Sequence, residues 1–306
     1  MRTMGNIYKY TFILSLVISA VSCKNKPVPS PDNWEIGTSI GFFTSFSQQE
    51  FFEFKNQGFN CLELGLKSFI TSSNEERDSL FENLKEKLDY SGMKIWSIHL
   101  PFDSIYDISV VDREARDFAV NEIIRYITLG KMFGAKKYVI HGSTDIKNES
   151  DRSIQIENCI ASLKILNEEV KKQGAQFAVE CLSRTCLGNT SAELLHIVNS
   201  VGNGIGICFD SNHLLHEKPE EFVEKVGALI CTVHISDYDG LKSRHWLPGR
   251  GNINWANVVS ALLKAGYQGP FMFEVKKKSP ENTGGAKELA GSWEFIKSEY
   301  EKSASK

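Results

Sequence analysis

Short apolar runs alternate with longer amphipathic segments along most of the chain. The runs are rich in β-branched and aliphatic residues, and the longer segments repeat apolar residues at i, i+3 and i+4, which is the helical period. The predicted strands cover residues 35–41, 61–66, 94–99, 137–141, 176–180, 205–210, 231–236 and 270–274. The predicted helices cover residues 47–57, 75–91, 112–133, 152–172, 191–200, 218–226, 255–265 and 286–297. This alternation predicts an α/β fold, a (β/α)8 TIM barrel.

The ends of the predicted helices carry the expected residues. Ser47, Asp112 and Asn254 are good N-caps, and glycines such as Gly92 and Gly134 follow helices where a left-handed cap is needed. A doubly wound open sheet is the alternative fold. It would usually carry a glycine-rich phosphate loop after an early strand, and the sequence has no such loop.

Composition narrows the class of protein. The chain has 306 residues, of which 42% are hydrophobic and 24% charged, as in ordinary globular proteins. The formal net charge is -3, which argues against a nucleic-acid partner, because binding phosphates needs an excess of Lys and Arg. Apart from Cys23, most cysteines lie in apolar runs and are predicted to be buried and free. A disulfide between Cys181 and Cys186 is the alternative for that pair.

The N-terminal residues have the pattern of an export signal. Arg2 and Lys9 precede a short apolar run at residues 11–21, which is too short to span a bilayer. The segment ending at Cys23 resembles a bacterial lipobox, which implies a signal peptide at 1–22 and lipidation of Cys23. A plain signal peptide is the alternative.

Three prolines then give residues 23–33 the composition of a semi-rigid tether. Residues 34–306 are expected to form a single barrel domain. The expected location is the cell envelope, on its periplasmic or surface side, with a lipid anchor in the membrane.

Polar side chains stand at the ends of six successive predicted strands. These residues are His99, His141, Glu180, Asp210, His234 and Glu274. Their spacing corresponds to about one βα unit per step, and a barrel gathers its strand ends at one mouth, where its chemistry lies. The sequence therefore predicts a cluster of metal-capable side chains at the mouth.

The segments around these residues resemble those of a known family. They are SIHLPF at His99, VIHGS at His141, AVECL at Glu180, GICFDSNH at Asp210 and His213, VHISD at His234, RHWLPGRGNINW at His245 and FMFEV at Glu274. Together they resemble the xylose-isomerase-like TIM barrels over residues 35–297. That superfamily includes sugar isomerases and epimerases, inosose dehydratases and the AP endonuclease family 2. The resemblance indicates the superfamily more specifically than it indicates the reaction.

The resemblance implies one divalent metal, held by Glu180, Asp210, His234 and Glu274. This donor set favours Mn²⁺, Mg²⁺ or Co²⁺, with Zn²⁺ possible. It also implies that Glu180 and Glu274 act as an acid/base pair on the two sides of an enediolate.

By the same resemblance, substrate binding is expected from His99, His141, His213, Arg244, His245 and Trp246. Capping of the next helix is the alternative role for His213, and loop packing is the alternative for Trp246. Glu63 either binds substrate or forms a salt bridge inside the barrel. His99 and His141 could instead hold a second metal. Ser243 stands where the endonucleases have a metal-binding Asp, which counts against a third metal and against DNA repair.

The expected function is isomerisation or epimerisation of an unphosphorylated sugar. No Lys/Arg cluster or glycine-rich loop marks a phosphate site. Two alternatives stay open. The first is a lyase or dehydratase that performs β-elimination on a keto-sugar or 3-keto-glycoside. The second is a carbohydrate-binding lipoprotein without catalytic activity.

Overall fold

The computed structural model describes residues 30–66, 73–276 and 285–305. Within these residues the strands form a single sheet of eight. The strands are β1 (Ile36–Ser39), β2 (Phe59–Gly65), β3 (Lys94–His99), β4 (Lys137–Ile140), β5 (Gln176–Glu180), β6 (Gly206–Asp210), β7 (Ile230–His234) and β8 (Phe271–Phe273). The α-helices are α1 (Gln48–Asn56), α2 (Asn74–Ser91), α3 (Arg113–Gly130), α4 (Arg152–Lys172), α5 (Ser191–Val201), α6 (Pro219–Val226), α7 (Trp255–Lys264) and α8 (Ala286–Ala304).

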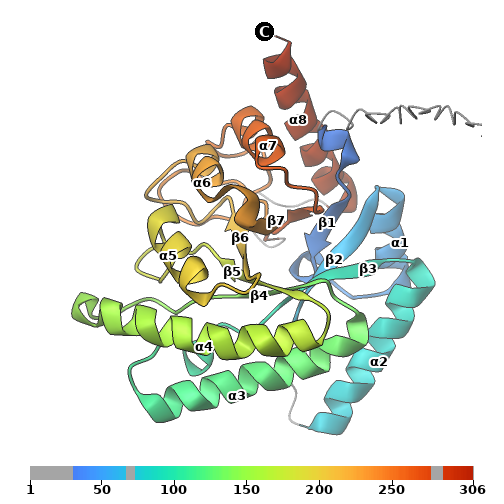
Figure 1. Cartoon of the computed structure of the whole chain (residues 1–306). Coiled ribbons are helices and arrows are strands. Elements are labelled where there is room, and N and C mark those ends of the chain that lie inside the picture. The colour runs from blue at the N-terminus through green and yellow to red at the C-terminus, as the bar shows by residue number, and fades with distance from the viewer. Residues whose placement is uncertain (1–29, 67–72, 277–284, 306) are drawn as a thin grey trace, which may run out of the picture.

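The sheet closes on itself. Strands from β1 to β7 that follow one another in the chain are neighbours and run parallel (Figure 1). β1 also pairs with β8. Just past β7, the Ile235 amide donates to Met272 O at 2.8 Å, and Ile235 O accepts from the Glu274 amide at 3.0 Å. These bonds join β7 to β8, so the predicted (β/α)8 barrel is confirmed.

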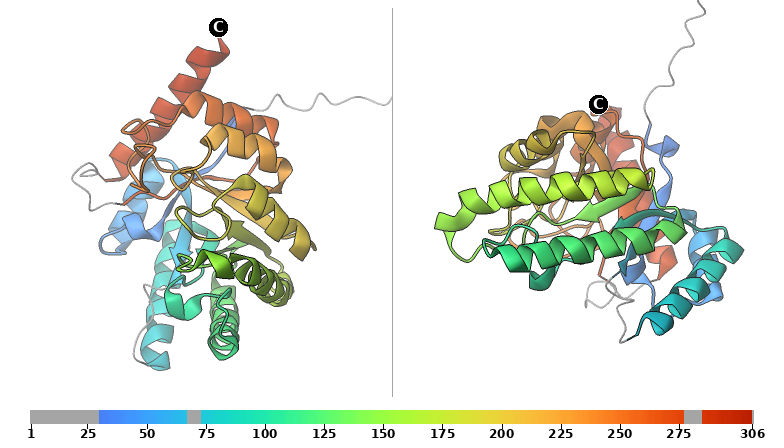
Figure 2. Two further views of the ribbon diagram at one scale, coloured as in Figure 1. Left: turned by 90° about the vertical axis from the view of Figure 1, so that its left-hand side faces the viewer. Right: turned by 60° about the horizontal axis from the view of Figure 1, so that its bottom comes forward.

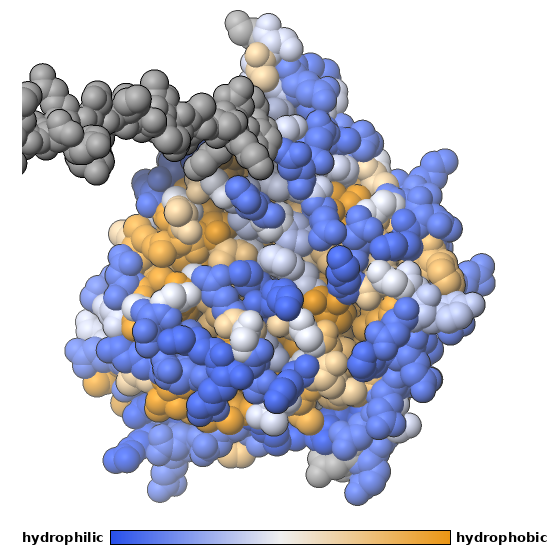
Figure 3. All heavy atoms as spheres, turned by 45° about the vertical axis from the view of Figure 1, so that its right-hand side comes forward, coloured by the Kyte–Doolittle hydropathy of each residue, from blue (hydrophilic) through white to orange (hydrophobic). Residues whose placement is uncertain are grey.

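The helices lie outside the sheet and cover it (Figure 2). Buried apolar residues of strands and helices form one contiguous core, with a smaller separate cluster of Val139, Ala178 and Cys208 on β4, β5 and β6. The face drawn in Figure 3 is largely hydrophilic, with hydrophobic side chains between. No helix in the described ranges is both long and apolar enough to cross a membrane.

The predicted helix caps are confirmed. Ser47, Asp112 and Asn254 each accept a hydrogen bond from the backbone amide three residues on, at 3.2, 2.8 and 3.1 Å. Gly92 and Gly134 adopt the left-handed conformation, with φ of 67° and 63°. These local signals set the lengths of the βα units.

Several element boundaries differ from the prediction, among them those of the first strand and the last helix. The first strand was expected to reach Gly41, but it ends at Ser39, and a 3-10 helix covers Ile40–Phe42. Its partner β8 has only three residues, so the ladder between them is short. The last helix was expected to end at residue 297, but it continues to Ala304, because Tyr300 extends the apolar face of Ile296 against the core.

The six cysteines in the described residues are free, so no disulfide joins Cys181 to Cys186. Both are buried, as the packing interpretation predicts. The predicted signal peptide and Cys23 lie outside the described residues. At the end of the predicted tether, Pro31–Asn33 forms a 3-10 helix, and the Trp34 indole donates to Tyr267 O at 3.0 Å.

Candidate metal centre

The six polar residues expected at strand ends converge at one mouth of the barrel. His99, Glu180, Asp210 and His234 are the last residues of β3, β5, β6 and β7, while His141 and Glu274 directly follow β4 and β8. Four of them, His99, His141, Glu180 and Glu274, line a cavity of about 270 Å³. The residues that line it are Ser39, Gly41, His99, Phe102, His141, Glu180, His213, His245, Glu274, Val275 and Lys276.

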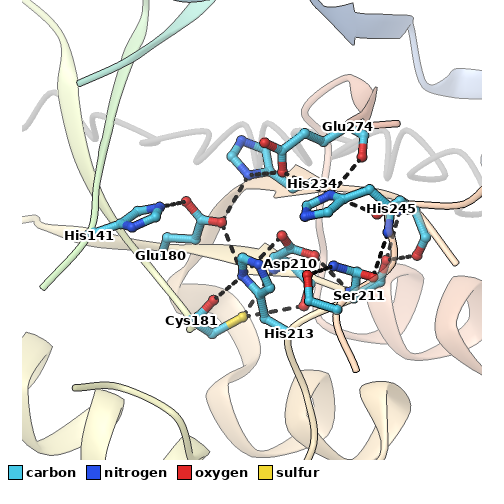
Figure 4. A network of polar contacts seen from close by, with 12 residues as sticks. His141, Glu180, Cys181, Asp210, Ser211, His213, His234, His245 and Glu274 are labelled. Carbon is cyan, nitrogen blue, oxygen red and sulfur yellow. Dashed lines mark hydrogen bonds and ion pairs between the residues drawn. The ribbon is translucent and has the colours of Figure 1, made fainter. Parts of the chain in front are cut away.

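Four of the six strand-end residues form a compact donor set. One ligand atom from each of Glu180, Asp210, His234 and Glu274 lies within 4.8 Å of all the others. His234 Nδ1 is 3.3 Å from Glu180 Oε1 and 3.2 Å from Glu274 Oε2. Figure 4 shows these side chains pointing toward one another. They are the residues that the resemblance assigns to the metal.

The donor set fits a divalent cation. Two of its oxygens, Asp210 Oδ2 and Glu274 Oε2, are buried and accept no hydrogen bond from the described residues, although a histidine nitrogen lies close to each, that of His213 at 3.1 Å and that of His234 at 3.2 Å. Buried carboxylates are costly unless positive charge balances them, and a divalent cation would supply that charge. Three carboxylates and one imidazole suit a hard metal ion. The residues present can therefore hold the metal.

Glu63 orients the His234 ring by contacting Nε2, the ring nitrogen other than the one that faces Glu180 and Glu274. Its Nε2 lies 2.9 Å from Glu63 Oε2, which also accepts a 2.8 Å hydrogen bond from the Ser97 hydroxyl. Glu63 is almost completely buried, and it is not among the residues that line the cavity. Of the two roles considered for Glu63, the geometry agrees with the internal salt bridge. Such a carboxylate fixes the ring of a metal-binding histidine and raises its basicity.

Two histidines flank the other side of Glu180. His99 Nε2 and His141 Nε2 lie 3.0 and 3.2 Å from Glu180 Oε2. Burial lowers the pKa of His99, but its hydrogen bond to Glu180 and the nearby carboxylates outweigh burial and raise that pKa to about 9. His99 Nδ1 donates to Leu100 O at 2.8 Å, so both ring nitrogens are donors when the ring is charged. A proton on the His99 ring therefore balances the charge of Glu180, whereas burial lowers the pKa of His141.

Asp210 and His213 form a second pair in the cluster. Burial raises the pKa of Asp210 to about 8, although the charge of His213 opposes it. His213 Nδ1 lies 3.1 Å from Asp210 Oδ2 and 3.4 Å from Glu180 Oε1. Capping of the next helix by His213 is wrong, because the N-cap residue of α6 is Lys218. His213 lines the cavity beside the donor set.

Of the three substrate-binding residues predicted in the loop after β7, one lines the cavity and two do not. His245 is buried and lines the cavity, and burial lowers its pKa to about 4, so its ring is neutral near pH 7. Arg244 pairs with Asp239 at 2.6 Å and lies over the Trp246 ring, 5.4 Å from its centroid. Neither Arg244 nor Trp246 is among the lining residues described above. The geometry of Trp246 agrees with the alternative role of loop packing.

Several residues of the site carry no assignment from the sequence, among them Phe102, Lys276 and Asn212. Phe102 lines the cavity, is 43% exposed, and stacks on the His141 ring with a centroid separation of 4.5 Å. Lys276, which follows β8, also lines the cavity, and buried Asn212 joins the loops after β6 and β7. Phe102 and Asn212 lie in the SIHLPF and GICFDSNH segments, so their closeness to strand ends was the available signal.

The chain belongs to the xylose isomerase-like TIM barrel family, whose model matches residues 52–298. It is 26% identical over 185 residues to L-ribulose 3-epimerase of Mesorhizobium japonicum, covering 58% of this chain and 60% of that protein. It is 25% identical over 131 residues to 3-dehydroshikimate dehydratase of Pseudomonas putida, covering 38% of this chain and 20% of that protein. The match spans 53% and 64% of the length of two further relatives, from Sinorhizobium fredii and Methanocaldococcus jannaschii.

Solved structures share the barrel. A D-tagatose 3-epimerase-like protein superposes with a TM-score of 0.73 at 24% identity, covering 87% of this chain and 97% of that one. The 3-keto-D-glucoside 4-epimerase YcjR of E. coli superposes with a TM-score of 0.69 at 19% identity, covering 87% of this chain and 99% of that one. At these identities the comparison establishes the fold.

Proposed function

We propose that the protein is a metal-dependent isomerase or epimerase that acts on an unphosphorylated sugar through an enediolate, with Glu180 and Glu274 as the acid/base pair. The observation that carries this proposal is the convergence of these glutamates, which both line the cavity, with Asp210 and His234 at the mouth of the barrel. The similarity to L-ribulose 3-epimerase supports the reaction class. We favour Mn²⁺, Mg²⁺ or Co²⁺ because the donors are mostly oxygens.

Glu180 and Glu274 would move the proton next to the substrate carbonyl. Burial would raise the pKa of both carboxyl groups, but the nearby histidines, His234 first among them, together outweigh it and hold both below the ordinary value. An ionised glutamate can take the proton as a base, and the other can return one. Return to the opposite face gives epimerisation, and return to the neighbouring carbon gives isomerisation. A divalent metal in this site would polarise the carbonyl and stabilise the developing negative charge.

The cavity lining supports an unphosphorylated sugar. Among the described lining residues Lys276 is the only Lys or Arg, so no cluster of cations faces a phosphate. We assign hydrogen bonding of sugar hydroxyls to His99, His141, His213 and His245. The half-exposed ring of Phe102 offers a surface for the apolar face of a sugar.

A lyase or dehydratase is the second candidate, and the similarity to 3-dehydroshikimate dehydratase favours it. It would start with the same proton removal by the same glutamates. Loss of a β-substituent from a keto-sugar or 3-keto-glycoside would then replace the return of the proton. Arg244 and Trp246 could contact a longer glycoside from the loop after β7.

The test is exchange of substrate hydrogen with solvent. The Mn²⁺-loaded protein is incubated in D₂O with D-tagatose, D-fructose, other free ketoses and aldoses, and 3-keto-glycosides, and NMR follows each sugar. We expect metal-dependent deuterium uptake next to a carbonyl, and the product separates epimer, isomer and eliminated aglycone. Binding of a sugar without exchange, by a folded and metal-loaded protein, would contradict catalysis and favour a carbohydrate-binding role.

We also propose that the chain is exported and lipidated at Cys23, as its N-terminal sequence suggests. Mass spectrometry of the mature N-terminal peptide tests this proposal, with Cys23→Ser as the control. An unmodified Cys23 in the exported protein would contradict it.

A further inference from the structure

Asn212 connects two loops of the mouth through a fully buried carboxamide. Its Oδ1 accepts hydrogen bonds from the backbone amides of Arg244 and His245, at 2.6 and 2.9 Å. Its Nδ2 donates to the Ser243 hydroxyl at 2.6 Å. One side chain after β6 thus holds three consecutive residues of the loop after β7.

His245, held in this way, has an unusual backbone. Its φ is +52°, in the left-handed region that residues with a Cβ rarely adopt. Its carbonyl accepts a 3.1 Å hydrogen bond from the Lys276 amide, so the loop after β8 fixes it from the other side. Strained backbone of this kind persists when its surroundings over-determine it, and it concentrates at functional sites.

The strained backbone sets the position of the His245 ring. Nδ1 lies 3.1 Å from Glu274 O, and because a carbonyl only accepts, Nδ1 carries the proton. In a neutral ring Nε2 is then a hydrogen-bond acceptor. The ring lines the cavity and meets the His213 ring edge-on, with centroids 5.6 Å apart.

We propose that Asn212 is a positioning residue that holds the His245 ring at the cavity in the orientation that binds a sugar hydroxyl. The substrate-binding part of this inference rests on the proposed function. An asparagine is needed because the position requires both a donor and an acceptor. An aspartate would lose the side-chain donor to Ser243 and would add a negative charge beside Asp210. The Oδ1 atom of Asp210 accepts a 2.7 Å hydrogen bond from the backbone amide of Asn212.

The test compares the wild type with Asn212→Ala in the full chain loaded with Mg²⁺. Asn158→Ala is the matched control, because the Asn158 carboxamide also donates to loop carbonyls, those of Ser109 and Val110 at 3.2 Å. Histidines are labelled with ¹⁵N, and the ring signals of His245 are assigned by their loss in His245→Gln. We expect Asn212→Ala to displace the His245 signals and to leave those of His99 and His141 in place. Wild-type His245 signals in Asn212→Ala would overturn the proposal.

Kinetics separate positioning from a general structural role. With a sugar that the wild type converts, Asn212→Ala should raise KM about tenfold and change kcat and Mn²⁺ affinity by less than about threefold, as for a lost uniform binding contact. The double variant Asn212→Ala/His245→Ala should be no worse than His245→Ala alone. Additive losses, or a fall in Mn²⁺ affinity, would contradict action through His245.

Two outcomes stay distinguishable. If the wild type converts no sugar, the proposed function fails, while the histidine signals still decide whether Asn212 positions the ring. If Asn212→Ala does not fold, Ser243→Ala removes one of the three hydrogen bonds and should displace the His245 signals from their wild-type positions. Unchanged signals in Ser243→Ala would then overturn the proposal.

Discussion

The interior of the barrel and its mouth are built by the same strands but differ in chemistry. On β4, β5 and β6 the interior layer is Val139, Ala178 and Cys208, which are fully buried and apolar. Two residues further along each strand stand His141, Glu180 and Asp210. Side chains two positions apart point to the same side of a strand, so the mouth layer lies two residues beyond the interior layer on the same side of each strand.

The difference shows which layer depends on a ligand. The interior layer is stabilised by burial of apolar surface. The mouth brings the carboxylates of Glu180, Asp210 and Glu274 within 4.8 Å of one another, which is unfavourable unless protons or a cation balance the charge. Changes at the mouth should therefore affect metal binding and reaction, and changes in the interior should affect stability.

Removal of the metal should have the largest effect. A chelator should abolish deuterium exchange, and re-addition of Mn²⁺ should restore it. Mn²⁺ at about 100 times its Kd should stabilise the fold by about 2.7 kcal/mol, which raises Tm by roughly 5–10 °C. Calorimetry with and without chelator measures the shift, and Glu180→Gln should show a much smaller one. Equal Tm values for the wild type under both conditions would contradict a metal at the mouth.

Loss of one glutamate should have the second-largest effect on the exchange reaction. Glu274→Gln removes a carboxylate that serves both as ligand and as base, so the exchange rate should fall by at least about a thousandfold while the fold survives. Glu221→Gln, a change on the exposed first turn of α6, should leave the rate unchanged. Exchange at near wild-type rate in Glu274→Gln would remove this residue from the acid/base pair.

The orientation of His234 by Glu63 should have a smaller effect. Glu63→Gln should weaken Mn²⁺ binding by roughly 10–100-fold, because the ring loses the carboxylate that fixes it. Titration calorimetry measures the affinity. Ser97→Ala, which removes only the hydroxyl that donates to Glu63, should weaken it less. If Glu63→Gln binds Mn²⁺ as tightly as the wild type does, the charge of Glu63 is not needed for the metal.

A change in the interior layer should hardly affect the reaction. Val139→Ala removes buried methyl groups and leaves a small cavity, which should lower the free energy of unfolding by about 2 kcal/mol. Denaturant unfolding measures that loss. The exchange rate per folded molecule should stay within about twofold of wild type. A large fall in that rate would show that the two layers are not independent.

The sequence predicted the features that depend on local pattern. The periodic apolar residues predicted the barrel, and the polar residues that end successive strands, from His99 to Glu274, predicted the mouth. The cap residues Ser47 and Asp112 fixed helix starts because a cap acts on its own first turn. The relation of Glu180 to His234 followed from the topology, since all strand ends of a barrel meet.

The sequence pattern did not predict contacts between residues that lie far apart in the chain. Asn212 reaches Arg244 and His245 through the packing of two irregular loops, which follow no period. Glu63 meets His234 across the barrel, over 171 positions in the chain. Arg244 seemed available for substrate until the loop brought Asp239 to within 2.6 Å of it. Loop conformation decides the contacts of Asn212 and Arg244, and closure of the barrel decides the contact between Glu63 on β2 and His234 on β7.

The most direct test of a metal centre at the mouth is anomalous X-ray diffraction from a crystal of the Mn²⁺-loaded protein. We predict one strong Mn peak within coordination distance of Glu180, Asp210, His234 and Glu274. A peak at any other place, or none from a protein that binds Mn²⁺ in solution, would contradict the assignment and the reaction that depends on it.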